Sequence, residues 1–295
     1  MKDKRILRNR LIVLILGLGV VVTVLTTISV LGLLGKESSS FFSLVSFKDF
    51  FLGTRWEPLL EPKHFGVWPL VMGTMMVAVG AIVIAVPAGV LAAVYLSEYA
   101  RSSTRKWLKP ILEILAGIPT VVYGYFALSF ITPVLKEWIP GMQIFNALAG
   151  AIVVAVMILP MISSLTDDAL QALPKSLKEG GYSLGATSFE VMKDILLPAA
   201  SGRIMASVLL AFSRAVGETM AVTLAAGSTP KMDWNYLESI QTMTAFIVQV
   251  SLGDTQAGGV EYLSAFAVGG LVFLITMVLN GLGSYAIVKS AKELT

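Results

Sequence analysis

Two charged residues lie near the middle of a long apolar run in the sequence. Arg214 and Glu218 both fall within residues 199–226, where a charged side chain costs on the order of 3 kcal/mol if the run crosses a membrane. The planar guanidinium group of arginine can hold two oxygens of a tetrahedral oxyanion at once. A glutamate can accept a hydrogen bond from a protonated oxyanion, whereas a fully deprotonated one offers no donor and is repelled. We therefore predict that Arg214 and Glu218 line a path for a substrate across the membrane, and their chemistry is compatible with an oxyanion.

The same spacing also fits a purely structural role. Residues four apart face each other on an α-helix, so an internal ion pair that locks the helix is the alternative for Arg214 and Glu218. Glu113, at the start of another apolar run, follows a basic stretch at 101–109. It is expected to be solvated or paired near the membrane surface, and we assign it no role.

The composition excludes several other kinds of chemistry. There is no cysteine, so disulfides and thiolate metal sites are ruled out, and the single histidine, His64, cannot form a histidine cluster. We expect no metal site and no catalytic residue. The nucleotide-binding motif G-x-x-x-x-G-K-[ST] does not occur, so the chain is not expected to be an enzyme or to bind a cofactor itself. The basic residues are not interleaved with aromatic ones, which argues against a nucleic-acid partner.

The elements that must position these residues are membrane spans. With 56% apolar residues, 14% charged residues and a mean hydropathy of +0.79, the chain is predicted to be an all-α integral membrane protein. The first apolar run is too long for a signal peptide and lacks a cleavage site, so we expect an uncleaved span. Six apolar runs have spanning length, at residues 11–34, 69–96, 111–134, 144–164, 199–226 and 264–288.

The distribution of lysine and arginine predicts which ends of the spans face the cytoplasm. If both termini and residues 97–110 and 165–198 are cytoplasmic, that face carries 14 basic residues and the opposite face carries 6. Basic residues concentrate on the cytoplasmic side of membrane proteins. We therefore expect both termini in the cytoplasm and residues 165–198 exposed there.

Two segments on the opposite face are long. In residues 35–68 the aromatic side chains are expected to lie at the membrane interface. In residues 227–263, Ile240, Met243 and Val250 follow helical spacing, which predicts a short amphipathic helix lying on the outer surface. A lid and a docking platform for an external partner are both open interpretations of this second segment.

Residues 167–198 have the features of two short helices. Leucines recur at helical spacing in residues 170–177, and the Gly-Gly pair at 180–181 is predicted to end this first helix. Thr187 followed by Glu190 has the spacing of a capping box. A second helix should therefore begin there and continue to the proline that closes the segment.

Several residues of this segment match, in type and spacing, the residues of a loop found in other proteins. They are, in order, Glu179, Gly180, Gly181, Gly185, Ile195, Leu197 and Pro198. In type and spacing they resemble the EAA loop of the permease subunits of bacterial ABC importers. The resemblance implies that the loop inserts into a groove on a separate ATPase subunit and couples the two proteins. Glycines stand where the family usually has alanines at the second and third positions, a small-for-small change that still permits close backbone approach.

Two further segments narrow the resemblance to one branch of that family. Residues 115–124 (LAGIPTVVYG) and 214–222 (RAVGETMAV) are similar to phosphate permeases of the PstC type. The resemblance implies a type I ABC importer permease (MetI-like) fold with six transmembrane helices in the cytoplasmic (inner) membrane of a bacterium or archaeon. It divides the chain into an N-terminal helix with a long outer loop (1–66), a permease domain (67–289) and a cytoplasmic tail (290–295).

The same resemblance implies a function and a set of partners. The chain would be the permease subunit of an ATP-driven importer of inorganic phosphate, paired with a second, PstA-like permease. Two copies of a PstB-like ABC ATPase would use ATP, and a PstS-like extracytoplasmic binding protein would deliver the phosphate. Membrane lipid surrounds the spans.

Two other functions stay open from the residues alone. A sulfate- or molybdate-type ABC permease would have the same spans and the same loop, and competition between oxyanions in an uptake assay separates it from a phosphate permease. A channel or secondary transporter would work without an ATPase. Such proteins often carry inverted repeats and proton relays at the midplane, and the sequence shows no convincing repeat. Copurification with an ATPase that contains a P-loop distinguishes the two classes.

Overall fold

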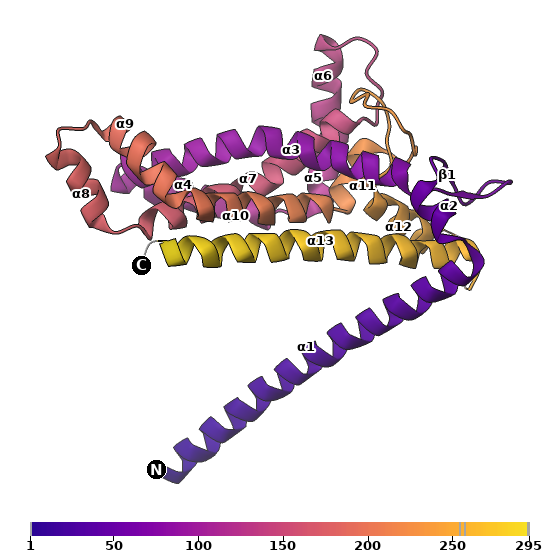
Figure 1. The fold of residues 1–295 in the computed structure, drawn as a ribbon, viewed down its shortest axis with the longest axis horizontal. Coiled ribbons are helices and arrows are strands. Elements are labelled where there is room, and N and C mark those ends of the chain that lie inside the picture. The colour runs from indigo at the N-terminus through magenta and orange to yellow at the C-terminus, as the bar shows by residue number, and fades with distance from the viewer. Residues whose placement is uncertain (1, 254, 257, 294–295) are drawn as a thin grey trace.

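The computed structural model describes residues 2–253, 255–256 and 258–293, and its regular structure is almost entirely helical (Figure 1). The α-helices are, in chain order, α1 (Lys2–Leu44), α2 (Phe47–Leu52), α3 (Trp68–Val94), α4 (Ser102–Gly117), α5 (Thr120–Phe126), α6 (Thr132–Trp138), α7 (Ala147–Gln171), α8 (Lys175–Ser183), α9 (Ser188–Glu190), α10 (Leu197–Val216), α11 (Met220–Ala226), α12 (Met243–Leu252) and α13 (Val260–Glu293). Three π-helical segments follow α3, α5 and α9 directly, at Tyr95–Tyr99, Ala127–Ile131 and Val191–Leu196. The strands β1 (Trp56–Glu57) and β2 (His64–Phe65) form an antiparallel hairpin with Trp56 opposite Phe65.

Among the described residues, five helical segments are long and apolar enough to cross a membrane. They are Leu11–Leu44, Trp68–Tyr99, Ala147–Gln171, Ser188–Val216 and Val260–Lys289. The predicted all-α membrane class is thereby confirmed, and these segments overlap five of the six predicted spans. The predicted tail at 290–295 does not start a new element, because α13 continues to Glu293. Residues 294–295 lie outside the described part of the chain.

The prediction of one continuous helix over residues 111–134, the remaining predicted span, is wrong. Helix α4 and the helical segment Thr120–Trp138 meet at a 90° bend, so they form a broken span or a re-entrant pair. The bend falls at Ile118 and Pro119. Proline has no N–H to donate and disfavours the α conformation in the residue before it, and Ile118 accordingly has extended backbone angles. The bend allows α4 to lie against α7, where ion pairs attach it.

The predicted helix over residues 199–226 is also interrupted. Helix α10 ends at Val216, and three residues separate it from α11. Gly217 follows α10 directly and lowers the helix propensity at this point. Non-helical backbone at membrane depth is tolerated only where protein buries it or where it lines a cavity, and Glu218 in the break is buried. The break lies between the two charged residues that the sequence placed on one helix.

Small residues allow the central helices to pack closely. A Cβ atom on Gly80 of α3 would lie 2.9 Å from the Cβ of Ala151 on α7, and one on Gly89 would lie 2.9 Å from Ile162. Close approach of backbones at small residues is a main source of helix association in membranes. The core formed by α3 and α7 continues into α10 and α11 through buried alanines and valines, and into α5 through Tyr123. This core holds α10 beside α7.

The two ends of the bundle carry different structures (Figure 1). We call the end with α8 and α9 the loop end, and the opposite end, with β1, β2 and α12, the hairpin end. Helix α1 extends away from the bundle and packs on α13 near its own C-terminal end, where the Ser38 hydroxyl donates to the Phe266 carbonyl at 3.0 Å. The helix predicted to lie on the outer surface exists as α12, but Met243 and Val250 are buried. These residues are buried because α12 packs against α13 and α3, and Ile240 lies before the helix, which begins at Met243.

Candidate functional site

A pocket of about 300 Å³ lies between α4, α7 and α10, on the side of the loop end. Most of its wall is apolar, from leucine, methionine and proline side chains. Its polar lining consists of Lys109, Glu113, Ser163, Ser164, Asp167 and Arg214. A small apolar pocket with a few converging polar groups is the usual form of a site for a small ligand. Arg214, one of the two residues predicted to line an oxyanion path, is part of it.

A buried carboxylate closes one side of this pocket. The side chain of Asp167, at the end of α7, is 1% exposed. Arg105 Nη2 donates to both of its carboxylate oxygens, at 3.1 Å and 2.9 Å, and Lys109 Nζ lies 2.7 Å from Oδ2. Two cations therefore compensate the cost of burying one carboxylate. The three side chains join α4 to α7, and together they carry one net positive charge.

Arg214 has no such compensation. It lies in the last turn of α10, and its side chain is exposed toward the pocket in the isolated chain. Among the described residues, no carboxylate lies within 4.0 Å of its guanidinium group. The alternative of an internal ion pair with Glu218 is not realised, because α10 ends before Glu218 and the spacing of four residues no longer places the two side chains on one helix face.

Glu218 lies outside the Arg214 pocket, in the break between α10 and α11, where it accepts hydrogen bonds from neighbouring segments. It is 8% exposed. Its Oε1 accepts a hydrogen bond from the backbone N–H of Ala221 at 3.1 Å, which satisfies one of the free donors at the start of α11. Its backbone carbonyl accepts from the Thr244 hydroxyl on α12 at 2.6 Å. Glu218 thus links α10, α11 and α12 at the point where the fifth span is interrupted.

Sequence reasoning missed five polar residues of the pocket. It assigned no role to Lys109, Glu113, Ser163, Ser164 or Asp167. The signal that could have found four of them is spacing, because Lys109 and Glu113 are four apart on one helix, and Ser163 and Asp167 are four apart on another. Each pair therefore lies on one helix face. What the spacing cannot show is that both faces point toward Arg214.

The loop at residues 167–198 folds differently from the prediction in one respect. The Gly-Gly pair at 180–181 lies inside α8 instead of ending it, and the chain turns at Gly185, which has φ +85°. This left-handed conformation favours glycine. The predicted capping box is confirmed, since the Thr187 hydroxyl accepts from the N–H of Glu190 and the Glu190 carboxylate accepts from the N–H of Thr187.

The helix that starts at this capping box does not end at Pro198 as predicted. Proline fits the first turn of an α-helix, where its missing N–H would have no partner inside the helix. Pro198 lies in the first turn of α10, and Ile195, Leu197 and their neighbours lead into that helix without a break. The end of the loop is therefore continuous with the helix that carries Arg214.

Packing beneath the loop explains part of its residue pattern. Gly181 is buried, and a Cβ atom there would lie 2.7 Å from Ile195 Cδ1 and 2.9 Å from Val191 Cγ2. Ile195 and Leu197 pack against a buried cluster that includes Leu170 at the end of α7. Of the residues predicted to couple to an ATPase, Gly181, Ile195 and Leu197 therefore hold the loop together. Glu179, Gly180, Gly185 and Pro198 lie on its surface.

The tip of the loop is exposed and apolar. Leu184 is 90% exposed and Phe189 is 66% exposed, with Tyr182 beside them. Behind the tip, Lys178 of α8 forms an ion pair with Glu98 of the π-helical segment that follows α3. A movement of α8 would thus reach α3 through this ion pair and α7 and α10 through the buried cluster.

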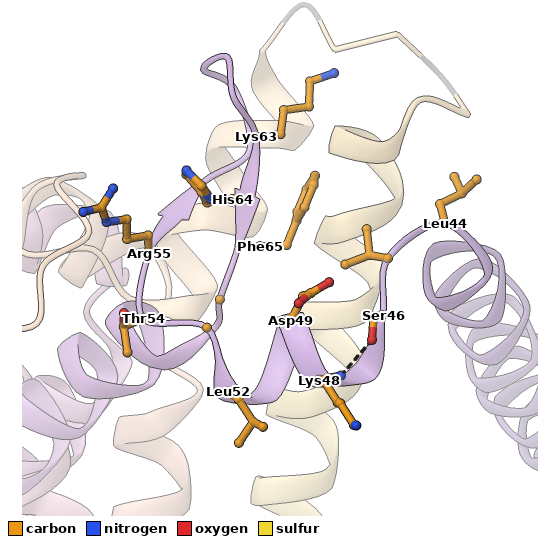
Figure 2. Close-up of a pocket in the computed structure, with 13 residues that line it drawn as sticks. Leu44, Ser46, Lys48, Asp49, Leu52, Thr54, Arg55, Lys63, His64 and Phe65 are labelled. Carbon is orange, nitrogen blue, oxygen red and sulfur yellow. Dashed lines mark hydrogen bonds between the residues drawn. The ribbon is translucent and has the colours of Figure 1, made fainter.

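The hairpin end carries a larger pocket that is separate from the Arg214 pocket. It has a volume of about 690 Å³ and lies between α2 and the hairpin (Figure 2). Lys48 and Asp49 line it from α2, and Arg55, Lys63 and His64 line it from the hairpin. Neither Arg214 nor Glu218 lines it.

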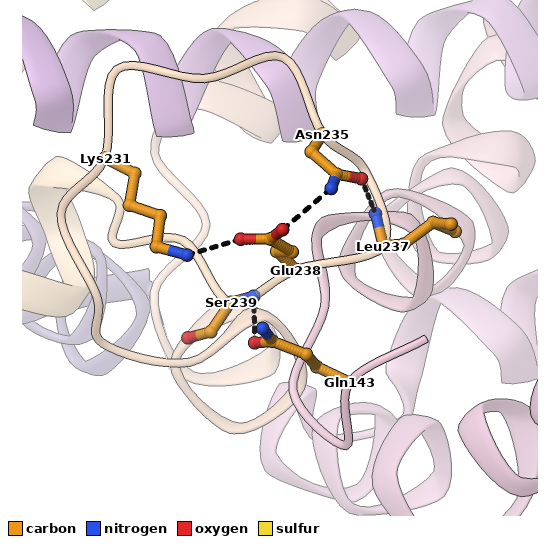
Figure 3. Close-up of polar contacts among 6 residues, drawn as sticks. All are labelled: Gln143, Lys231, Asn235, Leu237, Glu238 and Ser239. Carbon is orange, nitrogen blue, oxygen red and sulfur yellow. Dashed lines mark hydrogen bonds and ion pairs between the residues drawn. The ribbon is translucent and has the colours of Figure 1, made fainter. Parts of the chain in front are cut away.

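The long loop between α11 and α12 is fixed by polar contacts at the same end (Figure 3). Glu238 pairs with Lys231 and accepts from the Asn235 side chain at 2.9 Å, and the N–H of Ser239 donates to Gln143 at 2.9 Å. The hydrogen bond from Lys231 and its positive charge hold the pKa of Glu238 below the ordinary value of 4.5. The loop covers parts of α3 and α7. The N–H groups of Ala147 and Leu148 in α7 donate to its carbonyls, and its Tyr236 hydroxyl donates to the Met76 carbonyl of α3 at 2.9 Å.

Comparison with known families and proteins gives matches over most of the chain. The family model described as "Binding-protein-dependent transport system inner membrane component" matches residues 85–289. The chain is 35% identical over 268 residues to the "Probable ABC transporter permease protein YqgH" of Bacillus subtilis (strain 168), covering 91% of this chain and 86% of that protein. It is 33% identical over 288 residues to the "Phosphate transport system permease protein PstC" of Mesorhizobium japonicum, covering 89% and 86%.

Solved structures show the same fold. An inward-facing conformation of the MetNI methionine ABC transporter matches with a TM-score of 0.56 and 20% identity, over 76% of this chain and 94% of that chain. An amino acid ABC transporter matches with a TM-score of 0.51 and 19% identity, over 74% and 91%. The MetI-like fold and the resemblance to PstC-type permeases, both predicted from the sequence, are confirmed.

Proposed function

The chain belongs to the family of binding-protein-dependent transport system inner membrane components, and from this membership we propose that it is the permease subunit that moves inorganic phosphate through an ATP-driven ABC importer. One observation carries the choice of substrate class. Arg214 is a cation inside an apolar bundle, it lines a pocket, and no described carboxylate neutralises it. Since an uncompensated charge at membrane depth is costly, the pocket suits an anion. The PstC-type relatives support phosphate as that anion.

In this proposal the oxyanion contacts two residues along its path, Arg214 and Glu218. Arg214 binds the oxyanion in the pocket with its fork of N–H donors. Glu218 stands at the break between α10 and α11, where one carboxylate oxygen is held by the N–H of Ala221. Discontinuous helices at the midplane mark substrate sites in many transporters. A protonated phosphate would pass Glu218 by donating a hydrogen bond to it, and sulfate would be repelled.

The loop at residues 167–198 supplies the coupling in this proposal. Its exposed tip, Leu184 and Phe189, would insert into a groove on the ATPase subunit, because an apolar tip gains from being covered. Glu179, Gly180 and Gly185 would face that groove. ATP would be bound and hydrolysed by two copies of a PstB-like partner, and this chain would be a non-catalytic subunit.

The remaining partners and the orientation complete the proposal. A second, PstA-like permease would close the path on the open side of the Arg214 pocket, and a PstS-like binding protein would deliver phosphate at the hairpin end. Both termini and the loop end would face the cytoplasm, in agreement with the excess of basic residues there.

Copurification and competition test this function. The chain is purified from its native membrane in mild detergent, and the proteins that come with it are identified. We expect an ATPase with a P-loop and a second permease. In uptake assays with the complete complex, unlabelled phosphate should compete with labelled phosphate far better than sulfate or molybdate does. Phosphate uptake that continues without ATP would point to a channel, and preferential competition by sulfate or molybdate would move the cargo to those ions.

A further inference from the structure

The charges around the Arg214 pocket do not all have partners inside the chain. Asp167 and Lys109 neutralise each other, with Arg105 as a third member. Two lining residues are left over within the described residues, the cation Arg214 and the carboxylate Glu113, and they are not close enough to pair with each other. A pocket that holds one unpaired cation and one unpaired carboxylate offers a ligand both donors and an acceptor.

A third lining residue lacks a partner as well. Ser163, on α7, is fully buried, and its hydroxyl makes no hydrogen bond with any residue that the structure describes. Buried polar groups are nearly always hydrogen-bonded, so an unpartnered one needs an explanation. Ser163 lines the same pocket, although neighbouring atoms cover its hydroxyl oxygen. A ligand in that pocket would satisfy this hydroxyl after a small shift of the side chains that cover it. A serine hydroxyl can donate to an anionic oxygen and can also accept a hydrogen bond.

These three groups define the chemistry of the ligand. Arg214 only donates, and it requires anionic oxygens. An ionised glutamate only accepts, so Glu113 requires an O–H or N–H on the ligand. The ligand must therefore carry both anionic oxygens and a proton that it can donate, and the pocket of about 300 Å³ suits a small ligand with a few waters. A partly protonated tetrahedral oxyanion meets all three conditions, whereas a fully deprotonated one leaves Glu113 opposite a like charge.

We propose that Glu113, together with Arg214 and Ser163, forms a binding site for a protonated oxyanion and that Glu113 is the residue that selects for the proton. The proposal rests on the function proposed above and adds a specificity residue to it. Glu113 comes from α4, and the 90° bend after Gly117 allows this helix to lie against α7 beside the pocket. Glu218 does not share the pocket and has a hydrogen-bond donor of its own, the N–H of Ala221.

Glu113→Gln tests this role in the complete importer, reconstituted in lipid vesicles with its partner subunits. Labelled phosphate and labelled sulfate uptake are measured separately, and their kcat/KM values are compared. Glutamine still accepts a hydrogen bond but no longer repels a deprotonated oxyanion. The preference for phosphate over sulfate should therefore fall at least about tenfold, since hydrogen bonds to charged groups and like-charge repulsion are each large enough for such a change. Glu137→Gln removes the same charge from an exposed position on α6 that lines neither described pocket, and it should leave the preference unchanged.

Ser163→Ala provides the second measurement. Its hydroxyl serves any oxyanion, so its loss should weaken phosphate and sulfate uptake by similar factors, about tenfold in KM. If Glu113→Gln does not assemble, Glu113→Asp replaces it. The aspartate keeps the charge, so phosphate should stay preferred while its KM rises.

The outcomes separate this proposal from the proposed function. An unchanged preference in Glu113→Gln, or a lost preference in Glu113→Asp, overturns the role of Glu113 even if the wild type imports phosphate. A wild type that does not import phosphate overturns the proposed function, whatever the variants do.

Discussion

Gly181 is the residue whose substitution tests the packing of the loop most directly. A Cβ atom at this position would lie 2.7 Å from Ile195 and 2.9 Å from Val191, whereas a Cβ atom on Gly180 would meet nothing within 4 Å. Leucine gains about 1 kcal/mol over glycine from helix propensity at either position. Overpacking at Gly181 costs about 1–3 kcal/mol. Gly181→Leu should therefore be less stable locally than Gly180→Leu by about 1–3 kcal/mol.

Hydrogen exchange of the α8 amides in the purified full-length chain measures this difference. Because a factor of ten corresponds to about 1.4 kcal/mol, exchange should be roughly 5 to 150 times faster in Gly181→Leu than in Gly180→Leu. The amides of α12, which lies at the hairpin end of the bundle, serve as an internal control and should not differ. Equal exchange of α8 in the two variants would refute the reasoning, since it would show that Gly181 is not packed against Val191 and Ile195.

Four further predictions concern the loop, the path, the ion pairs and the opposite end. A cysteine replacing Gly185 becomes the only thiol of the chain, and an impermeant thiol reagent should label it in inside-out vesicles but not in intact cells. A side chain at φ +85° is strained by about 1–2 kcal/mol. The same variant should therefore show weaker coupling of ATP hydrolysis to uptake while it stays in the membrane. Glu218→Gln should reduce phosphate uptake and its preference over sulfate, and unchanged values of both would refute a role for Glu218 in the path. Asp167→Asn leaves Arg105 and Lys109 facing each other without a counter-charge, and since both are partly exposed we expect a loss of about 1–3 kcal/mol, measured as a lower midpoint of thermal unfolding. The pKa of Glu238 is lowered in the folded chain, so its ion pair contributes stability above the unfolded-state pKa and loses it as the pH falls through the lower folded-state pKa. Proteolysis of the loop between α11 and α12 should therefore accelerate in acid below 4.5, and Glu238→Gln should abolish that dependence.

The parts of the fold that could be predicted from the sequence depend on local chemistry. The capping box at Thr187 and Glu190 needs only residues three apart, and the long apolar helices need only a continuous run of apolar side chains. The bend at Pro119 was not predicted, because proline inside an apolar run is compatible with a straight span when neighbouring helices satisfy the freed carbonyl groups. The position of Gly181 inside α8 depends on Val191, ten residues later, which closes over it. Helix propensity alone favours ending the helix there.

The same distinction applies to the candidate site. Arg214 could be identified because a charge inside an apolar run is unusual wherever the helix lies. Its neighbours could not, because Glu113 and Ser163 stand 101 and 51 positions earlier in the chain and reach the pocket only through the packing of α4 and α10 on α7. The alternative ion pair between Glu218 and Arg214 assumes one continuous helix, and the break after Val216 removes that assumption.

The pocket and the loop share α7, and this connection gives the proposed coupling a mechanical basis. Asp167 lines the pocket and lies four residues before the end of α7 at Gln171, which is about 6 Å along the helix axis. Three residues separate Gln171 from the start of α8 at Lys175. A displacement of α8 by an ATPase would therefore reach Asp167 with little loss, because the helix between them is stiff and its last turn is packed in the buried cluster. Asp167 holds Lys109, which lies one helical turn from Glu113 on α4. Under the proposed coupling, a movement that pulls Asp167 away from α4 would free a second cation beside the ligand and would shift the carboxylate proposed to select it. ATP-driven motion would then change the affinity of the pocket as well as its access.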